Sequence, residues 1–322
     1  MVAITDLRLG SLVQPAGIDL ATVLALRPVD GDFSRFEGGS SELRNEWVIR
    51  SSPADIIIEG TFTNPIDGEP GVSHVRWALD AGKHVCTTNK GPIALQGDAL
   101  KAIAKKNKVH FEFEGTVLSG TPTIRLARRM FHGLTINGFE GVLNGTSNYV
   151  LGRLEAGLDL DAAVLEAQEL GFAEADPTAD IDGSDVQLKV VILANELFHG
   201  EMTIADVPRK GISSLTTQDF LDAAERGLHW KLIGSATRAP NGSIDARVAP
   251  VALPVTHPLS GLSGRTNAVA FHTDLLNTVT ISGPGAGRVE TAYALLSDII
   301  VIHEDRESQP SITTAVEGSN NV

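Results

Sequence analysis

The sequence predicts an α/β protein of two domains, one built on a parallel sheet and one of the α+β type, and three observations support this. The chain has 322 residues, more than the roughly 250–300 at which single hydrophobic cores usually stop growing. Over the first third, short apolar runs alternate with helical periodicity, as in strand–helix–strand units around a parallel sheet. Beyond Glu114 the pattern changes to loops, longer helices and alternating strands, so we expect a domain boundary there.

In the first domain we expect four strands and two helices. The strands are predicted at the apolar runs VAIT before Asp6, DIIIEGT (55–61), KHVCTT (83–88) and VHFEF (109–113). We expect the first two of these strands to be buried. A helix is predicted between Glu69 and Gly82, because apolar residues recur there on one helical face and glycine often closes a helix. A second helix is expected over roughly 98–107.

In the second domain, capping residues indicate where helices begin and end. Asp159 and Gly171 stand where the N-cap and C-cap of one helix belong. Ser184 and Gln187 match a capping box, which predicts that the next helix begins at about Asp185. That helix continues as VVILANELF, which is apolar on nearly every face, so we expect it to be buried.

The last part of the chain contains strands, a turn, a helix and a polar tail. Alternating runs between about 243 and 281 predict the strands, and the run GPGAGRVETAYALLSDIIVI reads as a turn and a helix that ends a domain. We therefore predict that 1–113 and 282–322 form one domain and 114–281 the other. The tail after Glu304, rich in Ser, Asn, Gln and Thr, is predicted to be mobile.

Composition excludes several classes of protein. The net charge of −14 argues against binding to nucleic acid, which needs a basic face. The single cysteine, Cys86, cannot form an internal disulfide, so nothing favours an oxidising compartment and we predict the cytoplasm. The N-terminus has no charged-then-apolar signal pattern, and no stretch approaches about 18 uninterrupted apolar residues. We therefore expect neither a membrane protein nor a secreted one.

The stretch GFAEADPTADIDGSDVQLK (171–189) concentrates acidic side chains in front of the lysine of the buried helix. The acids are Glu174, Asp176, Asp180, Asp182 and Asp185, and the lysine is Lys189. Asp180 and Asp182 match part of a calcium loop, but the position that needs a bidentate glutamate is Lys189, so no calcium site is expected. Asp185 and Lys189 alternatively form an i,i+4 pair that only stabilises the helix.

Burial gives the same pair a chemical interpretation. Desolvation lowers the pKa of a lysine and makes it a proton donor or acceptor near neutral pH. A neighbouring aspartate fixes the position of the ammonium group. Lys189 and Asp185 are therefore candidate catalytic residues.

Four blocks of the sequence look like the signature blocks of homoserine dehydrogenases, in the same order and with compatible spacing. They are TTNKGPIA (87–94), GVLNGTSNYVL (141–151), the acidic stretch (171–189) and SGPGAGRVETAYALLSDI (282–299). The chain resembles a short form of that family, from residue 1 to about 302, without the regulatory ligand-binding module of some members. The resemblance implies a Rossmann-like nucleotide-binding domain beside a substrate-binding and dimerisation domain. It also implies the reversible oxidation of L-homoserine to L-aspartate 4-semialdehyde with NAD or NADP, and a homodimer formed through the sheet of the second domain.

The resemblance further implies roles for individual residues. Lys189 corresponds to the proton-transferring lysine, Asp185 to a substrate ligand beside it, and Lys90 to a residue between the nicotinamide and the substrate. Glu174 corresponds to the carboxylate that binds the ammonium group of the substrate, and Asp180 belongs to the same substrate-binding set. Cofactor contacts are implied at Thr61, Lys90, Gly171 and Gly287. A site for a monovalent cation (Na⁺), formed mainly by carbonyl oxygens, is implied at Glu114, Val117, Ser119 and Thr121.

The chain departs from the family at its N-terminus. A dinucleotide-binding domain normally opens with a strand, a G-x-G-x-x-G turn and a helix, whereas this sequence begins with a run that resembles the second strand. About 25 to 40 residues are missing by comparison with the ~30-residue unit that carries the fingerprint. We therefore expect a late start or a genuine truncation, which leaves two unpaired, buried strand edges. Asp6 is expected to bond the adenosine ribose, whereas Arg8 suits a 2′-phosphate, so the choice of cofactor stays open.

Plainer alternatives accompany these assignments. Lys90 alternatively is a solvated lysine at the end of a strand, and the GPGAG stretch an ordinary turn before a helix. The chain alternatively oxidises another small hydroxy acid or amino alcohol, and a substrate without an ammonium group would have little use for Glu174. A catalytically silent homologue is favoured only by the missing glycine motif.

Overall fold

The computed structural model describes residues 1–307. The strands are β1 (Ala3–Asp6), β2 (Gly10–Val13), β3 (Gly39–Ser40), β4 (Ile56–Glu59), β5 (His84–Thr87), β6 (Phe111–Glu112), β7 (Ile136–Val142), β8 (Leu228–Arg238), β9 (Ile244–Pro254), β10 (Thr266–Thr273) and β11 (Thr278–Pro284). The α-helices are α1 (Leu20–Ala25), α2 (Asn45–Ser51), α3 (Gly71–Asp80), α4 (Lys90–Asn107), α5 (Gly115–Leu118), α6 (Gly145–Glu155), α7 (Leu160–Glu169), α8 (Thr178–Ile181), α9 (Ser184–Phe198), α10 (Thr217–Glu225) and α11 (Arg288–Glu307). Within residues 1–307, no helix has the length and apolar character that crossing a membrane requires.

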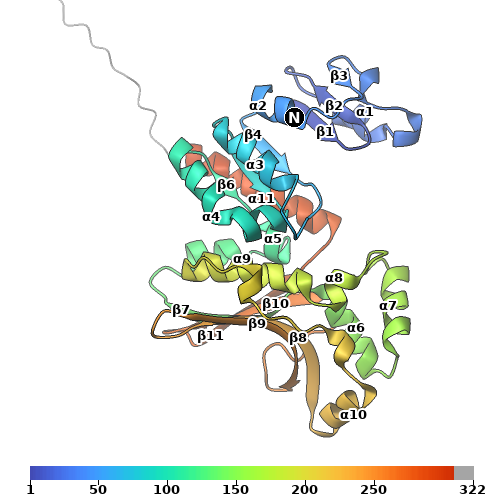
Figure 1. The fold of residues 1–322 in the computed structure, drawn as a ribbon, viewed down its shortest axis with the longest axis vertical. Helices are drawn as coiled ribbons and strands as arrows, with labels where there is room; N and C mark the ends of the chain where they lie inside the picture. The colour runs from blue at the N-terminus through green and yellow to red at the C-terminus, as the bar shows by residue number, and fades with distance from the viewer. Residues whose placement is uncertain (308–322) are drawn as a thin grey trace, which may run out of the picture.

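Strands β4, β5 and β6 form a parallel sheet (Figure 1). Helix α3 packs on β4 and β5, α4 packs on α3, and α11 packs on β5. Val85 and Cys86 in the central strand are completely buried, as expected for a strand with helices on both sides. Three of the four predicted strands are therefore confirmed as β4, β5 and β6, and the helix predicted between Glu69 and Gly82 is confirmed as α3.

The prediction that the run before Asp6 is a buried strand of the parallel sheet is wrong. The Asp6 carboxylate accepts hydrogen bonds from the backbone N–H groups of Arg8 at 2.8 Å and Leu9 at 3.0 Å. This tight turn reverses the direction of the chain, so β1 pairs antiparallel with β2. Together with β3 they form a small sheet that is separate from the parallel one. That sheet has its own apolar cluster, formed by Leu12, Ile18, Val23 and Phe33.

Strands β1 and β4 each pair on one side only among residues 1–307. The prediction of two unpaired strand edges therefore holds for β1 and β4, but the prediction that these edges are buried is wrong. Residues Ala3 to Thr5 of β1 are half-buried, and Ile58 of β4 is 43% exposed. Both strands lie at the margin of their sheets, where only one face is packed.

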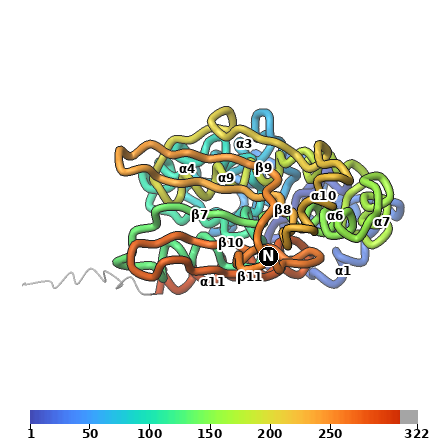
Figure 2. Tube along the Cα trace, turned by 90° about the horizontal axis from the view of Figure 1, so that it is seen from below, coloured from blue at the N-terminus to red at the C-terminus, as the bar shows by residue number. Residues whose placement is uncertain are grey.

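The other sheet is antiparallel, with the order β11–β10–β7–β8–β9. Helix α9 lies along one face of this sheet, and α6, α7 and α10 gather at one end of it (Figures 1 and 2). The strands predicted between 243 and 281 are confirmed as β9, β10 and β11. The helix predicted between Asp159 and Gly171 is confirmed as α7, with the Asp159 carboxylate accepting a hydrogen bond from the Ala162 N–H.

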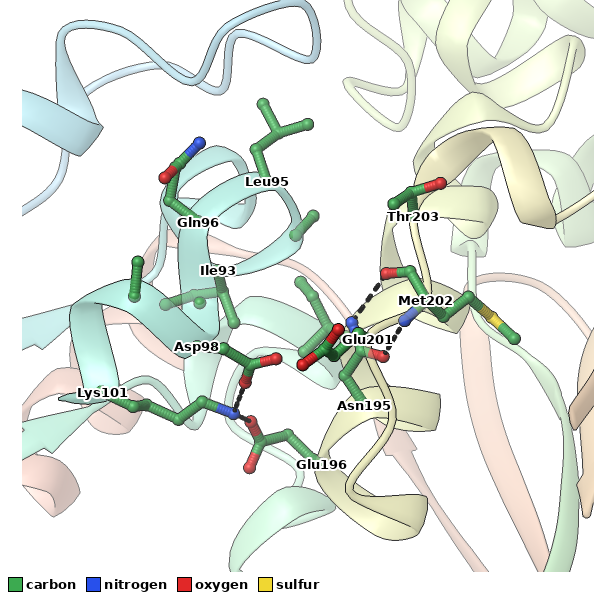
Figure 3. A pocket seen from close by; sticks show the side chains of 14 residues that line it. Ile93, Leu95, Gln96, Asp98, Lys101, Asn195, Glu196, Glu201, Met202 and Thr203 are labelled. Carbon is green, nitrogen blue, oxygen red and sulfur yellow. Dashed lines mark hydrogen bonds and ion pairs between the residues drawn. The ribbon is translucent and has the colours of Figure 1, made fainter. Parts of the chain in front are cut away.

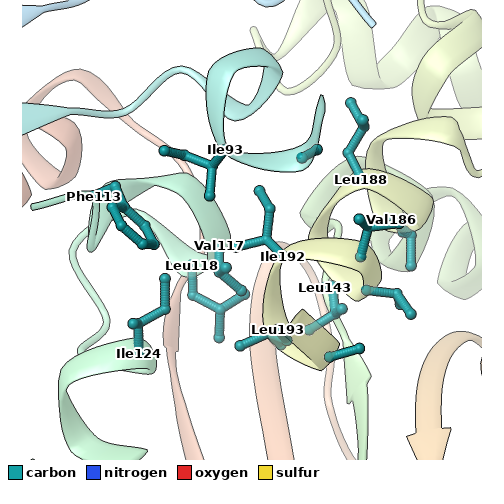
Figure 4. Packing of buried hydrophobic residues seen from close by; sticks show 14 of the residues in the cluster. Ile93, Phe113, Val117, Leu118, Ile124, Leu143, Val186, Leu188, Ile192 and Leu193 are labelled. Atoms are coloured by element: carbon teal, nitrogen blue, oxygen red, sulfur yellow. The ribbon is translucent and has the colours of Figure 1, made fainter. Parts of the chain in front are cut away.

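The main core is built around α9, which is buried as predicted. Side chains of α9 such as Val186, Ile192 and Leu193 pack against residues from four other segments (Figure 4): Ile93 of α4, Val117 and Leu118 of α5, Leu143 after β7, and Phe113 after β6. The helix is apolar all round because it lies between the antiparallel sheet and α4, so every face has an apolar neighbour.

The prediction that a capping box starts this helix is wrong. The Ser184 hydroxyl donates to the Asp182 carboxylate at 2.8 Å, and the Gln187 amide donates to the Val207 carbonyl at 2.6 Å. The N-cap is Gly183, with φ +83°. Ser184 is bound to a residue just before the helix and Gln187 to the segment after it, so neither side chain caps the backbone.

At the C-terminus, the chain returns to the parallel sheet as α11, which contacts β5 and α5. The division into 1–113 with 282–322 and 114–281 stays a prediction. The main apolar cluster runs without a break from Val85 in the parallel sheet to Phe271 in the antiparallel one. Helix α11 extends to Glu307. The rest of the predicted mobile tail, residues 308–322, lies outside the described residues.

Candidate active site

Lys189 and Asp185 lie one helical turn apart in α9 and form a buried ion pair. The Lys189 Nζ atom is 2.7 Å from Asp185 Oδ2 and donates a hydrogen bond to the Leu143 carbonyl at 2.6 Å. Lys189 is only 6% exposed. Burial lowers the pKa of Lys189, although the Asp185 carboxylate acts in the opposite direction. The pair is thus an i,i+4 pair, but one without the solvent that usually surrounds such pairs.

Lys90 reaches the same carboxylate from another helix. Its Nζ atom lies 3.3 Å from Asp185 Oδ1. The Lys90 charge further lowers the pKa of Lys189. Lys90 is the first residue of α4, because the Asn89 side chain caps this helix by accepting a hydrogen bond from the Gly91 N–H at 3.0 Å. The predicted start of this helix near residue 98 is therefore wrong, since that prediction overlooked the cap.

A second ion pair keeps α4 and α9 in register. Lys101 Nζ lies 2.8 Å from Glu196 Oε1, and Arg128 also pairs with Glu196. Lys101 follows Lys90 by eleven residues, and Glu196 follows Asp185 by the same number. Eleven residues make about three helical turns, so the two residues of each helix lie on the same face of that helix. The two helices therefore run side by side in the same direction, with a charged contact at each end.

The cavity beside the Lys101–Glu196 pair, shown in Figure 3, is distinct from this site. It has a volume of about 240 Å³ and is lined by α4, the end of α9 and residues 201–203. Lys101 pairs there with both Asp98 and Glu196. The lining contains none of the predicted catalytic, substrate-binding, cofactor-binding or cation-binding residues.

Asn144 joins the aspartates of the acidic stretch, and the sequence analysis missed it. Its Nδ2 atom donates hydrogen bonds to Asp180 Oδ1 at 2.6 Å and to Asp185 Oδ2 at 2.9 Å. Its Oδ1 atom accepts from the Ser147 N–H at 2.8 Å, which makes Asn144 the N-cap of α6. An asparagine between an apolar run and Gly-Thr-Ser was a usable capping signal.

The two aspartates that share Asn144 are shifted in opposite directions. Burial raises the pKa of Asp180, and the neighbouring Asp185 charge adds to that effect. Burial also acts to raise the pKa of Asp185, but the ammonium groups of Lys189 and Lys90 hold that pKa well below its ordinary value. Carboxyl groups whose pKa values are pushed apart are typical of sites that bind and transfer charge.

Glu174 lies away from this cluster in the structure. It is exposed, in the segment between α7 and α8, and its backbone carbonyl accepts a hydrogen bond from Gln168 at 3.1 Å. Its carboxylate forms no ion pair with Lys189 or Lys90 among the contacts of residues 1–307. The carboxylates next to the lysines are therefore Asp185 and, through Asn144, Asp180.

Polar side chains also gather where β4 and β5 end. The carboxylate of Glu59 at the end of β4 is buried and accepts hydrogen bonds from the Thr61 N–H at 2.9 Å and the Thr87 hydroxyl at 3.0 Å. The Asn89 amide donates to the Thr61 hydroxyl at 3.3 Å. This network connects Thr61 to the residue before Lys90. Glu59 was missed because it matches no motif that can be read without the sheet. Asn89 lies in the TTNKGPIA block, but the sequence assigned it no role.

The other predicted cofactor residues make no hydrogen bond or ion pair with Lys189 or Asp185 within the described part of the chain. Asp6 and Arg8 form the turn after β1. Gly171 follows α7 with φ +68°, and Gly287 lies between β11 and α11 with φ +145°. The φ of Gly287 is one that residues with a side chain rarely adopt, so the backbone of this turn favours glycine.

The predicted Na⁺ ligands all come from one short segment around α5. The Glu114 carboxylate is buried and accepts hydrogen bonds from the N–H groups of Thr123, Ile124 and Arg125. Its side chain is thus fully used in holding the following turn. The Ser119 and Thr121 hydroxyls contact Thr291 and the Pro284 carbonyl. A cation would depend on the backbone carbonyls of Glu114, Val117, Ser119 and Thr121, and this site stays a prediction.

The fold and this cluster together define a class of protein. A parallel α/β sheet with polar loops at its strand ends, facing a desolvated lysine held by an aspartate, is the arrangement of an enzyme of the nucleotide-dependent oxidoreductase type. Comparison with known proteins gives the particular family.

The family model of homoserine dehydrogenase matches residues 122–300. The NAD(+)-dependent homoserine dehydrogenase of Pseudomonas canavaninivorans is 56% identical over 304 residues, which cover 94% of this chain and 86% of the relative. A crystal structure of a putative homoserine dehydrogenase from Archaeoglobus fulgidus superimposes with a TM-score of 0.81 at 36% identity, covering 94% of this chain and 88% of the other. A hyperthermophilic archaeal homoserine dehydrogenase in complex with NADPH has a TM-score of 0.79 at 28% identity, with the same coverage. The chain belongs to the homoserine dehydrogenase family, which confirms the predicted resemblance and fold class.

The double role of Asn144 predicts that two variants separate its functions. Asn144→Ser keeps a good N-cap, so thermal unfolding stays close to parental. It removes the donor shared by Asp180 and Asp185, and a lost hydrogen bond to a charged group lowers kcat/KM by roughly 10- to 100-fold. Asn144→Ala loses both roles and also costs about 0.5–2 kcal/mol of stability. A Ser variant with parental kcat/KM would mean that Asn144 only caps α6.

Proposed function

We propose that this protein catalyses the reversible oxidation of L-homoserine to L-aspartate 4-semialdehyde with NAD or NADP. The observation that carries the proposal is the buried Lys189, which Asp185 holds 2.7 Å away beside a second lysine. Family membership at 56% identity to an NAD(+)-dependent homoserine dehydrogenase supports the substrate and the cofactor class. The test is an assay of the full chain with L-homoserine and either NAD⁺ or NADP⁺. If the protein reduces neither nucleotide, the proposal is refuted.

The residues of this chain handle the proton and the charges of the reaction. When bound, NAD⁺ or NADP⁺ supplies the acceptor for the hydride that leaves the alcohol carbon. Lys189 in its neutral form accepts the hydroxyl proton, and burial together with the Lys90 charge lowers the pKa of Lys189 and so favours that form. Asp185 and the Leu143 carbonyl keep the Nζ atom in place before and after the transfer. In the reverse direction, the Lys189 ammonium returns the proton.

The reacting end of a nicotinamide nucleotide fits the residues at the carboxyl ends of β4 and β5. Thr61 and Asn89 form a hydrogen-bonded rim there, and Lys90 projects from it to Asp185. Ligands of open α/β sheets bind at this end of the strands. Gly287 adopts φ +145°, which residues with a side chain rarely adopt, and a glycine lets another group approach its backbone closely. We propose contacts with the cofactor at Thr61, Lys90, Gly171 and Gly287, and with its adenosine ribose at Asp6 and Arg8.

The amino-acid part of the substrate is proposed to bind to the acidic stretch. Asp180 and Asp185 are fixed by Asn144, and Glu174 is exposed at the edge of the same stretch, where it is free to approach an ammonium group.

Glu174 tests the substrate class. If Glu174 binds the ammonium group, Glu174→Gln raises the KM for homoserine by about tenfold or more, since the charged partner of an ammonium bond is lost. Glu169→Gln, an exposed glutamate at the end of the neighbouring α7, serves as the matched control and leaves KM unchanged. Equal KM values in the two variants would remove Glu174 from the site.

A homodimer through the antiparallel sheet is also part of the proposal. Along β10, Val269 and Phe271 face the core around α9, whereas Ala268 and Ala270 face the opposite side with Ile233 of β8. Leu259 and Leu262 of the same chain already cover that second cluster. The feature that suits a second copy is β11, which lies at the edge of the sheet and pairs on one side only among residues 1–307. We expect a dimer by sedimentation velocity at micromolar concentration, and a monomer there would contradict this proposal.

We further propose that the protein works in the cytoplasm. Its one cysteine, Cys86, is buried in β5, where burial raises the pKa of the thiol. A buried thiol of this kind is unreactive and gains nothing from oxidising conditions. Recovery of the native protein from a membrane or secreted fraction would contradict the assignment.

Replacement of Lys189 tests its role in proton transfer. Lys189→Ala is expected to lower kcat by roughly 10²- to 10⁴-fold, the range of general acid–base residues, while binding of the cofactor barely changes. Lys189→Arg does not restore activity, because a guanidinium stays charged and cannot accept the proton. Lys231→Ala removes another buried lysine, whose Nζ atom donates to the Leu262 carbonyl at 2.6 Å, and it controls for stability. If the pair only stabilised the helix, its loss would cost about 0.2–0.5 kcal/mol and leave kcat intact.

A further inference from the structure

Asn267 is a buried amide without a hydrogen-bonding partner. It lies in β10 and is 1% exposed, and neither its Oδ1 nor its Nδ2 atom has a partner in residues 1–307. Native proteins rarely leave both halves of a buried amide unpaired, because the group loses its bonds to water without replacement. Asn148 shows the usual situation, since it is equally buried and donates to the carbonyls of Gly264 at 3.0 Å and Thr266 at 3.3 Å.

The unpaired amide lies between two segments of the active site. An ideal Cβ atom on Gly285 would be 2.3 Å from Asn267 Cγ, so the amide packs directly against the backbone of the turn that ends β11. An ideal Cβ atom on Gly145 would be 3.2 Å from Asn267 Oδ1. Gly145 follows Asn144, which binds Asp185, and Gly285 stands two residues before Gly287. Asn267 thus touches both the segment that holds the catalytic aspartate and the proposed cofactor turn.

The turn 285–287 lies between two flanks that hydrogen bonds hold. Before the turn, the Thr121 hydroxyl donates to the Pro284 carbonyl at 3.0 Å. After it, the Ser119 and Thr291 hydroxyls lie 3.0 Å apart and attach the first turn of α11. Between these points stand two glycines and an alanine, and glycine adopts backbone angles that other residues do not. The composition of the turn therefore permits a change of backbone conformation between its two held ends.

The unpaired amide of Asn267 presents an NH₂ group as donor and a carbonyl oxygen as acceptor in one plane. A backbone peptide group, with its C=O and N–H, is complementary to this pattern. Because the Asn267 amide is enclosed on all sides, the peptide groups of the adjacent turn can reach it, whereas a dissolved ligand cannot. We propose that Asn267 is a positioning residue for cofactor binding: when the dinucleotide binds, the turn 285–287 shifts and its backbone pairs with the Asn267 amide, which fixes Gly287 against the cofactor. This inference rests on the proposed function.

The test compares two asparagines that are equally buried. Asn267→Leu replaces an unpaired amide by an apolar group of similar size, so thermal unfolding of the cofactor-free protein stays at or above the parental temperature. Dinucleotide affinity, measured by fluorescence titration, falls about tenfold, and the KM for the dinucleotide rises to match, as expected for the loss of one or two hydrogen bonds. The KM for homoserine stays at the parental value. Asn148→Leu shows the reverse pattern, with lower thermal stability and unchanged dinucleotide affinity.

The outcomes separate this inference from the proposed function. A parental protein that binds neither NAD nor NADP refutes the proposed function, whereas a parental protein that binds and an Asn267→Leu variant that binds equally well overturn the role of Asn267 alone. A cofactor-free Asn267→Leu protein that is destabilised while its affinity is unchanged also overturns it, since Asn267 would then be an ordinary structural residue of β10. If leucine prevents folding, Asn267→Ala undergoes the same two measurements.

Discussion

The structure depends on one buried aspartate that two lysines share. Asp185 pairs with Lys189 at 2.7 Å and with Lys90 at 3.3 Å, in a region from which water is largely excluded. Asp180 adds a second carboxyl group, but it reaches this cluster through Asn144, and burial raises its pKa. The two lysines therefore share one directly paired carboxylate, and burial together with the Lys90 charge lowers the pKa of Lys189. This arrangement is the basis of the proposed proton transfer.

The rest of the fold keeps these three groups together. Helices α4 and α9 run side by side, and the Lys101–Glu196 pair three turns away prevents them from sliding. Both helices begin at the site, so their positive ends face it and favour the aspartate. The antiparallel sheet covers the other side of α9 and supplies the Leu143 carbonyl that accepts from Lys189. Without any one of these contacts, Lys90, Asp185 or Lys189 would be left buried without its partner.

Residues far apart in the chain connect the proposed cofactor side of the site with the proposed substrate side. Asn89 links the end of the parallel sheet to Lys90, and Asn144 links the end of β7 to Asp180 and Asp185. Asn267 lies between the segment of Asn144 and the glycine turn before α11. Amides suit these positions because each both donates and accepts hydrogen bonds without adding charge to a site that already holds several.

The sequence by itself determined the local elements and the candidate chemistry. Period and composition were enough to predict β4, β5, β6, α3, α7 and a buried α9, because these patterns reflect packing that each segment requires. The acidic stretch and Lys189 were recognisable as a block. Three local features could not be predicted: the antiparallel pairing of β1, the N-cap of α4 at Asn89 and the loss of the capping box at Ser184. Each depends on a hydrogen bond whose alternatives are equally good locally. Only the tertiary structure brought Lys90 to Asp185 and joined Asn144 to two aspartates, because these contacts link residues 36 or more positions apart. That Asn267 is unpaired likewise follows from how helices and sheets pack around it.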